Sequence, residues 1–127
     1  YDGRLESEVR GNIMDKELLK KVYQALNDKK AEEITLLEIG QISPIADYFV
    51  IASGSNVNQL NAMKDAVDEV MYTNGLHARQ IEGNSKSTWI LMDYGDMIVH
   101  LFSKEDRLFY NLERIWKDGK EINPEEL

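Results

Sequence analysis

Residues 87 to 102, STWILMDYGDMIVHLF, constrain the fold more than any other part of the chain. Apolar residues alternate on each side of Tyr94-Gly95, a pair that fits a two-residue turn with positive φ. This pattern predicts a β-hairpin, and the position of the turn sets which residues face each other. The expected cross-strand pairs are Asp93 with Asp96, Leu91 with Ile98, and Trp89 with His100.

The two faces of the predicted hairpin differ in polarity, because successive side chains of a strand point to opposite sides of a sheet. The paired residues named above share a mixed face, which bears acids, an indole and an imidazole. The other face is wholly apolar and consists of Ile90, Met92, Met97, Val99 and Leu101. We therefore expect the apolar face to form the core beneath helices. Two alternatives stay open for the mixed face: a helix covers it too, or it binds another protein.

Patterns before the hairpin predict one helix and then two strands. Apolar residues recur with a period near 3.6 over residues 15 to 28, which is typical of a helix with one buried stripe. Short β-branched and aromatic runs follow at Ile34–Ile39 and Tyr48–Ser53. The second run has no polar alternation, so we expect that strand to be covered on both faces.

A second helix is expected between two cap signals. Asn56 and Gln59 have the spacing of a capping box, and Asn74-Gly75 supplies a stop with a left-handed cap. A short strand near residues 77 to 81 should follow and lead to the hairpin. The expected buried stripe of this helix is Leu60, Met63, Val67, Val70 and Met71.

A last helix is expected after the hairpin, where Ser103 and Asp106 form a Ser-x-x-Asp box. Lys104 and Arg107 near its start are expected to be solvated or paired with neighbouring acids. Its apolar stripe is Leu108, Phe109, Leu112, Ile115 and Trp116. The complete order is αββαβββα, which predicts an α/β fold with a mixed sheet of about five strands packed with helices.

The length of 127 residues is typical of one domain. Residues 1 to 13 are polar and aperiodic and precede Met14, so we expect them to be an appended or disordered segment, with the natural start at Met14. We expect a single domain over residues 14 to 119 and a frayed acidic tail over residues 120 to 127.

Composition excludes several classes of function. The chain has no cysteine, which rules out disulfides, thiolate catalysis and cysteine-bound zinc. No apolar run approaches the roughly 18 residues of a membrane helix, and no signal-peptide pattern is present, so we expect a cytoplasmic protein. Asp and Glu outnumber Lys and Arg by 23 to 15, and the net charge of -8 opposes extensive contact with nucleic acid. A basic protein is the more natural partner.

Asp93 and Asp96 raise the question of a metal site, since two close carboxylates can hold Mg²⁺. Directly opposed like charges in a sheet are unfavourable by roughly 0.2 to 1 kcal/mol. The first interpretation is that water screens the aspartates at the mouth of the hairpin, or that one of them caps the turn. The second is a protein-binding hairpin. A magnesium pair is the third, and it lacks the glycine-rich phosphate cradle that such sites use.

Gly54-Ser55 and the two histidines, His77 and His100, are the other candidates for catalysis. A Gly-Ser turn that opens a helix can hold a phosphate, as it does in nucleotidyltransferases. Those enzymes also carry two acids one residue apart on the next strand, and this chain does not, which favours a tight turn with a helix cap. Two histidines alone make neither a triad nor a zinc site.

Two long segments, residues 46 to 70 and residues 82 to 119, closely resemble the ribosomal silencing factor family, also called RsfS or Iojap. The likeness runs from about Met14 to Gly119. The residues that carry it are Asp47, Gly54, Glu82-Gly83, Trp89, Asp93-Tyr94-Gly95-Asp96, Val99-His100, Arg107, Tyr110, Leu112-Glu113 and Trp116.

This resemblance implies a fold similar to that of nucleotidyltransferases, without their activity. It implies that the protein binds the large ribosomal subunit through ribosomal protein L14 and sterically prevents the small subunit from joining. Translation is then repressed when nutrients are limiting. The resemblance also implies a homodimer when the protein is free. The alternative function is that of a nucleotide- or metal-binding enzyme with a nucleotidyltransferase-like fold.

The residues and the resemblance together predict which side chains meet the partner. Acids should steer the encounter with a basic protein, while Trp89 and nearby apolar groups should supply the affinity. We expect no catalytic, cofactor-binding or metal-binding residue. The expected partner-binding residues are Trp89, Leu91, Asp93, Tyr94, Asp96, His100 and Glu82.

Overall fold

Six strands form one mixed sheet in the computed structural model, which describes the backbone of residues 3–40, 46–110 and 119–127. The strands are β1 (Glu32–Glu38), β2 (Tyr48–Gly54), β3 (Gln80–Glu82), β4 (Trp89–Asp93), β5 (Met97–Ser103) and β6 (Lys120–Glu121). Their order across the sheet is β3-β4-β5-β2-β1-β6. Strands β2 and β5 are parallel, and every other neighbouring pair is antiparallel. The mixed α/β fold is therefore confirmed.

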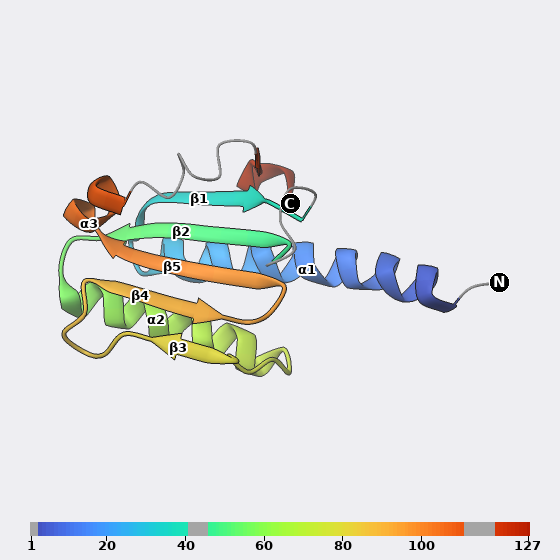
Figure 1. The fold of residues 1–127 in the computed structure, drawn as a ribbon, viewed down its shortest axis with the longest axis horizontal. Coiled ribbons are helices and arrows are strands. Elements are labelled where there is room, and N and C mark those ends of the chain that lie inside the picture. Colours follow the sequence, from blue (N-terminus) through green and yellow to red (C-terminus); the bar gives the residue numbers. More distant parts are fainter. Residues whose placement is uncertain (1–2, 41–45, 111–118) are drawn as a thin grey trace.

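Two long helices cover one face of this sheet. The helices are α1 (Gly3–Asp28), α2 (Val57–Thr73), α3 (Lys104–Tyr110) and the 3-10 helix η1 (Pro124–Glu126). Figure 1 shows α1 and α2 behind the strands, and α3 at the end of the sheet where β5 finishes. Within the described ranges, no helix is both long and apolar enough to cross a membrane.

Helix α1 begins at Gly3, far before the predicted start at residue 15. Figure 1 shows its N-terminal part projecting beyond the sheet. Residues 3 to 13 carry no apolar period near 3.6 in the sequence, so periodicity alone does not predict this part of the helix. The structure gives residues 3 to 13 a helical backbone, and their origin as an appended segment stays a prediction.

The register of the hairpin differs from the predicted one by two residues. The turn residues are Gly95 and Asp96, because the Tyr94 N–H donates to the Met97 carbonyl at 2.9 Å. Gly95 has a φ of 89°, which favours glycine. The observed pairs include Trp89 with Phe102, Leu91 with His100, and Asp93 with Ile98. The predicted pairs were wrong, but a shift of two residues leaves every side chain on its predicted face.

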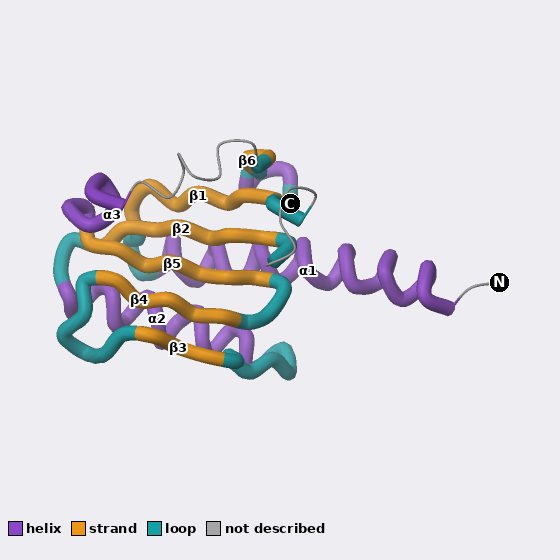
Figure 2. The backbone as a smooth tube through the Cα atoms, viewed as in Figure 1, coloured by secondary structure: helices purple, strands orange, loops and turns teal. Residues whose placement is uncertain are grey.

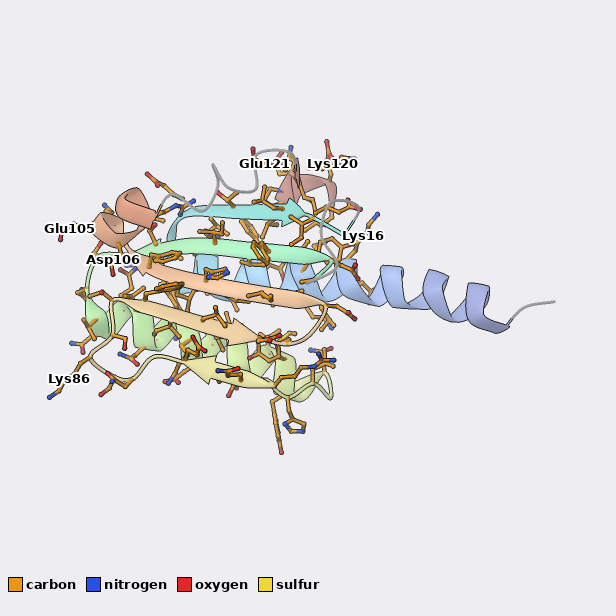
Figure 3. The ribbon with its side chains drawn as sticks, in the orientation of Figure 1. Lys16, Lys86, Glu105, Asp106, Lys120 and Glu121 are labelled. Atoms are coloured by element: carbon orange, nitrogen blue, oxygen red, sulfur yellow. The ribbon has the colours of Figure 1, made fainter. Side chains whose placement is uncertain are left out.

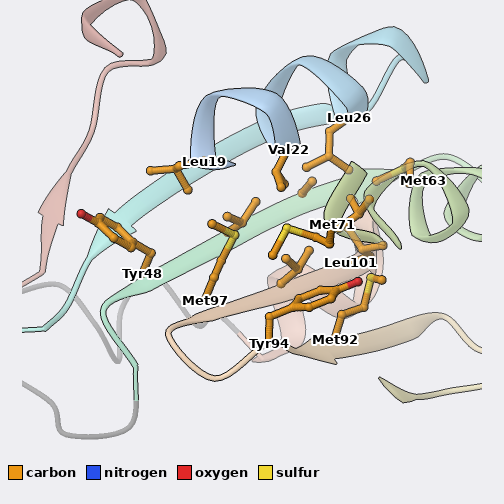
Figure 4. Packing of buried hydrophobic residues seen from close by; sticks show 14 of the residues in the cluster. Leu19, Val22, Leu26, Tyr48, Met63, Met71, Met92, Tyr94, Met97 and Leu101 are labelled. Atoms are coloured by element: carbon orange, nitrogen blue, oxygen red, sulfur yellow. The ribbon is translucent and has the colours of Figure 1, made fainter. Parts of the chain in front are cut away.

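The predicted apolar face is confirmed as part of the main core. Its hairpin residues are all buried in one cluster with side chains from both long helices, among them Leu19, Leu26 and Met63. Figure 4 shows α1 and α2 directing these side chains onto the sheet. Strand β2 is buried along its whole length, as its unbroken apolar run predicts. Its alternate residues enter two different clusters, one on each face.

The chain end expected to be a frayed tail contributes a sixth strand, which corrects the prediction of about five. Strand β6 pairs with β1, and the Ile122 N–H donates to the Leu36 carbonyl at 2.8 Å. Ile122 and Leu127 pack partly buried against the main core. Figure 2 shows β6 beside β1 at the edge of the sheet. A strand this short has no alternation to reveal it, since backbone pairing alone defines it.

The predicted caps are confirmed. The Asn56 side chain accepts a hydrogen bond from the Gln59 N–H at 2.8 Å, and Gly75 after α2 has a φ of 82°. The Ser103 hydroxyl accepts from the Asp106 N–H at 3.1 Å at the start of α3. The predicted apolar stripe of the last helix falls on residues 108 to 116, whose side chains lie outside the described part of the structure.

Candidate partner-binding surface

The predicted mixed face lies opposite α1 and α2, and we call it the aromatic face. Its rings come from three neighbouring strands and are Phe49, Trp89, His100 and Phe102. His100 and Phe102 stack nearly parallel, with centroids 5.9 Å apart and planes 5° apart. Phe49 meets His100 edge-on at 5.2 Å. The residues alternate with those of the main core, so the same strands serve both faces.

Trp89 is the exposed end of this aromatic cluster. Its ring stacks on Phe102 with centroids 5.3 Å apart, and its Nε1–H donates to His100 Nδ1 at 3.4 Å. The side chain nevertheless keeps 36% of its surface exposed, while Phe102 is completely buried. A large aromatic side chain that is held on one side and open to solvent is typical of a protein-binding hot spot.

His100 is buried at the centre of the cluster, with 5% of its surface exposed. Its partners across the sheet are the apolar residues Ile51 and Leu91. Burial lowers the pKa of His100 from 6.5 to about 4, because desolvation disfavours the charged imidazolium. The imidazole is therefore neutral at physiological pH, and its Nδ1 is available as an acceptor.

The side chain of Arg107, on α3, is buried against the aromatic face of the sheet. The expectation that it is solvated was wrong. Its guanidinium donates to the hydroxyls of Ser53, at 3.0 Å, and Thr35, at 2.9 Å, and to the Glu33 carbonyl. Glu33 has a φ of 50° and lies where the pairing of β1 with β2 is irregular. Arg107 thus fastens α3 to a bulge in β1. No periodic pattern predicts this contact, because its partners come from distant segments.

Thr88, just before Trp89, ties β4 to α3. Its hydroxyl donates to the Asp106 carboxylate, and its carbonyl accepts from the Ser103 N–H at 2.8 Å. Lys104 forms an ion pair with Glu32 across the sheet end and not with its neighbouring acids. The start of β4, next to Trp89, is therefore held by two hydrogen bonds of Thr88, one to Asp106 and one to Ser103.

Carboxylates border the aromatic face on the side of β3 and β4. Glu82 is exposed, lies opposite Leu91, and accepts from the Gln80 amide at 2.6 Å. Asp93 and Leu91 are half-buried on the same face. The aromatic face therefore has buried rings at its centre, the exposed Trp89 beside them and carboxylates along the β3–β4 side. This arrangement suits a partner with basic side chains.

Asp93 and Asp96 do not oppose each other. The Asp93 carboxylate accepts from the Gly95 N–H at 2.8 Å, so the interpretation that one aspartate caps the turn is confirmed. The Asp96 side chain is exposed, and its carbonyl accepts from the N–H groups of Asp47 and Tyr48. Burial raises the pKa of Asp47, and the charge of Asp96 raises it further. In the part of the chain that the structure describes, no three His, Asp or Glu side chains form a set that could hold a metal ion.

Tyr94 lies on the opposite face from the rest of the predicted partner-binding set. It is buried in the main core, and its hydroxyl donates to Asp68 on α2 at 3.0 Å. Among the predicted residues, the structure thus leaves Trp89, Asp96 and Glu82 exposed and buries Tyr94 and His100. Tyr94 was predicted to be a turn residue because the turn was placed one residue too early, whereas it continues the alternation of Ile90 and Met92 on the core face.

A cavity of about 420 Å³ lies where the parallel strands β2 and β5 end. Gly54 and Ser55 line it together with Ser103 and the acids of α3 that Figure 3 labels, Glu105 and Asp106. A Cβ on Gly54 would come within 3.0 Å of the Leu60 side chain, so glycine is needed for close packing. Together with the Asn56 cap, this accounts for the Gly-Ser turn as a structural feature.

Comparison with known proteins identifies the family. A sequence model of the family described as "Ribosomal silencing factor during starvation" matches residues 13–127. The chain belongs to the ribosomal silencing factor family. Ribosomal silencing factor RsfS of Halalkalibacterium halodurans is 37% identical over 113 residues, which cover 89% of this chain and 97% of that protein. Ribosomal silencing factors act on the ribosome to repress translation, so family membership favours a regulatory protein over an enzyme.

Two further relatives extend the comparison. A mouse protein named "Mitochondrial assembly of ribosomal large subunit protein 1" is 31% identical over 120 residues, which cover 91% of this chain and 52% of the mouse protein. A crystal structure of a Bacillus halodurans protein is similar with a TM-score of 0.74 at 34% identity, and covers 84% of this chain and 97% of that one. The ribosomal silencing factor fold is thus confirmed, while the likeness to nucleotidyltransferases stays a prediction.

Proposed function

We propose that this ribosomal silencing factor binds the large ribosomal subunit through ribosomal protein L14 and blocks association with the small subunit. The block is steric, and it represses translation under nutrient limitation. Family membership supports the action on ribosomes, and the name of the mouse relative associates that protein with the large subunit. We place this activity in the cytoplasm.

The observation that carries the proposed binding site is the position of Trp89. This indole is 36% exposed at the edge of a buried aromatic cluster, and Glu82 and Asp93 lie farther along the same face, opposite Leu91 and at the end of β4. Truncation of such an aromatic anchor typically costs more binding energy than any neighbouring contact. The acidic rim and the net charge of -8 favour a basic partner and accelerate its association.

The residues predicted for the interface take two roles in this proposal. Trp89, Leu91 and Glu82 contact the partner directly, and Asp93 and Asp96 extend the rim toward the hairpin turn. His100 is buried and supports the surface from within, whereas Tyr94 lies in the main core on the opposite face and takes no part in the proposed contact. The protein acts by binding and needs neither catalysis nor a cofactor.

A co-sedimentation experiment with isolated large subunits tests the site. We expect Trp89→Ala to weaken binding at least about tenfold, as truncation of a hot spot does, and to restore subunit joining measured by light scattering. Tyr72→Ala is the matched control, because Tyr72 is a 65% exposed aromatic residue on α2, away from the aromatic face. Wild-type binding by Trp89→Ala would remove Trp89 from the interface.

We also propose that the free protein is a homodimer. Sedimentation equilibrium across a range of concentrations measures this directly. If Trp89→Ala dissociates the dimer as well as the ribosome complex, the same apolar surface serves both contacts. A monomer at every concentration would refute the dimer without affecting the ribosome-binding proposal.

A further inference from the structure

His100 occupies an unusual place for a polar side chain. It is 5% exposed, its neighbours across the sheet are aliphatic, and three aromatic rings surround it. Burial of a polar group is unfavourable unless a hydrogen bond compensates for it. The compensating bond that the structure describes is the one donated by Trp89 Nε1–H to His100 Nδ1, at 3.4 Å.

This bond joins the interior of the aromatic face to its exposed edge. Because Nδ1 accepts, the neutral imidazole carries its proton on Nε2. Trp89 and His100 also stack, with ring centroids 6.2 Å apart and planes 27° apart. Phe102 holds the same indole by stacking at 5.3 Å. One hydrogen bond and two ring contacts thus restrict both the plane of the indole and its rotation within that plane.

We infer that His100 is a positioning residue for partner binding, which fixes the indole of Trp89 by accepting its N–H. This inference rests on the proposed function. A side chain that is already ordered loses less conformational entropy when the partner binds. A phenylalanine at position 100 would reproduce the stacking but not the acceptor, so packing alone does not explain a histidine here.

Two substitutions separate the acceptor from the packing. His100→Phe keeps a ring and removes the acceptor. His100→Asn loses the ring and keeps an acceptor, because the asparagine side-chain oxygen occupies about the place of Nδ1. A positioning role predicts that asparagine preserves the orientation of Trp89 better than phenylalanine does, whereas a packing role predicts the reverse order.

The first measurement needs no ribosome. In ¹⁵N-labelled protein, the two tryptophans give two indole N–H signals, and Trp89→Phe identifies the one from Trp89. We expect His100→Phe to shift this signal and to speed its hydrogen exchange with water about tenfold or more, and His100→Asn to leave it near the wild-type position. An unchanged Trp89 signal in His100→Phe would overturn the inference. If His100→Phe does not fold, His100→Leu replaces it in the same comparison.

The second measurement is binding to isolated large subunits. We expect His100→Phe to weaken binding by about two- to tenfold, the effect of ordering one side chain, and His100→Asn to bind nearly as the wild type does. In a Trp89→Ala background, His100→Phe should have no further effect. An equal further loss there would show that His100 acts independently of Trp89 and would overturn the inference.

The two arms keep the two proposals distinguishable. If Trp89→Ala binds the large subunit as tightly as the wild type does, the proposed interface fails. The indole signal still shows in that case whether His100 positions Trp89. If Trp89→Ala loses binding but His100→Phe leaves the indole signal unchanged, the interface stands and the positioning role fails.

Discussion

The two faces of the sheet are built from the same strands but differ in how their side chains are buried. The face under α1 and α2 is filled with aliphatic and methionine side chains, most of them fully buried. The aromatic face combines rings, one histidine and a gradient from the buried Phe102 to the exposed Trp89. Both faces thus contribute buried apolar side chains to stability, and the aromatic face differs in ending at the exposed Trp89, where we propose that the partner binds.

The largest effect is expected on the face under the helices. Leu101 on β5 is completely buried in the main core, so Leu101→Ala should lower the free energy of unfolding by about 3 kcal/mol. Urea denaturation measures this loss. Binding of the folded variant to large subunits should be unchanged. If the fully folded variant bound large subunits much more weakly, the face under the helices would also contribute to binding.

The second largest effect is expected from acid, which should lower the free energy of unfolding through His100 on the aromatic face. The folded protein keeps His100 neutral down to a pKa of about 4, while the unfolded chain binds a proton at about 6.5. The unfolded state therefore holds more protons between these values, and the free energy of unfolding falls by up to about 3 kcal/mol as pH decreases from 6.5 to 4. Below pH 4 this contribution falls no further.

The matched control for this titration is His100→Phe. The difference between the two stability profiles isolates His100, because the other groups titrate in both proteins. Asp47 acts in the opposite direction, since its raised pKa favours the folded state at low pH. Parallel wild-type and variant profiles would show that His100 does not titrate as a buried group.

A smaller effect is expected from the hydrogen bond that ties the hairpin to α2. Tyr94→Phe removes the donor to Asp68 and should cost about 1 kcal/mol of stability. Burial and the Asp68 carboxylate both raise the pKa of Tyr94, so the folded protein resists its ionisation in alkali. Thermal unfolding measures the loss, and Tyr72→Phe on the exposed surface of α2 should have no comparable effect.

The smallest effect on stability should come from the acidic rim. Glu82→Gln keeps an acceptor for the Gln80 amide, so the free energy of unfolding should change by less than about 0.5 kcal/mol. Association with large subunits should nevertheless slow and depend less on salt, because a steering charge is lost. Stopped-flow measurement of the association rate tests this. Glu69→Gln, an exposed acid on α2, should leave the rate nearly unchanged.

Much of the fold follows from local patterns. The alternation in residues 87 to 102 correctly assigned the two faces of the hairpin, and cap signals correctly marked the start and end of α2. The register escaped prediction because a shift of two residues preserves both faces. Strand β6 escaped because its two residues are defined by pairing with β1 and not by a pattern of their own.

The candidate site was predictable only in part. Trp89 and Glu82 were predicted as interface residues because a large aromatic and a nearby acid on a mixed strand face indicate a binding surface. Their exposure supports that choice, whereas Tyr94 lies in the core and serves α2. The hydrogen-bond partners of Arg107 lie on β1 and β2, more than fifty residues earlier in the chain, so no spacing in the sequence predicts these contacts.

The sequence by itself determined which side chains share a face, where α2 and α3 begin, and that the chain carries excess negative charge. These properties depend on residue spacing and composition, which are local. Tertiary structure alone decided that His100 is buried and neutral and accepts the Trp89 N–H, and that Arg107 fastens α3 to β1. Burial and hydrogen bonding between distant segments depend on how the strands are ordered, and that order is a property of the whole sheet.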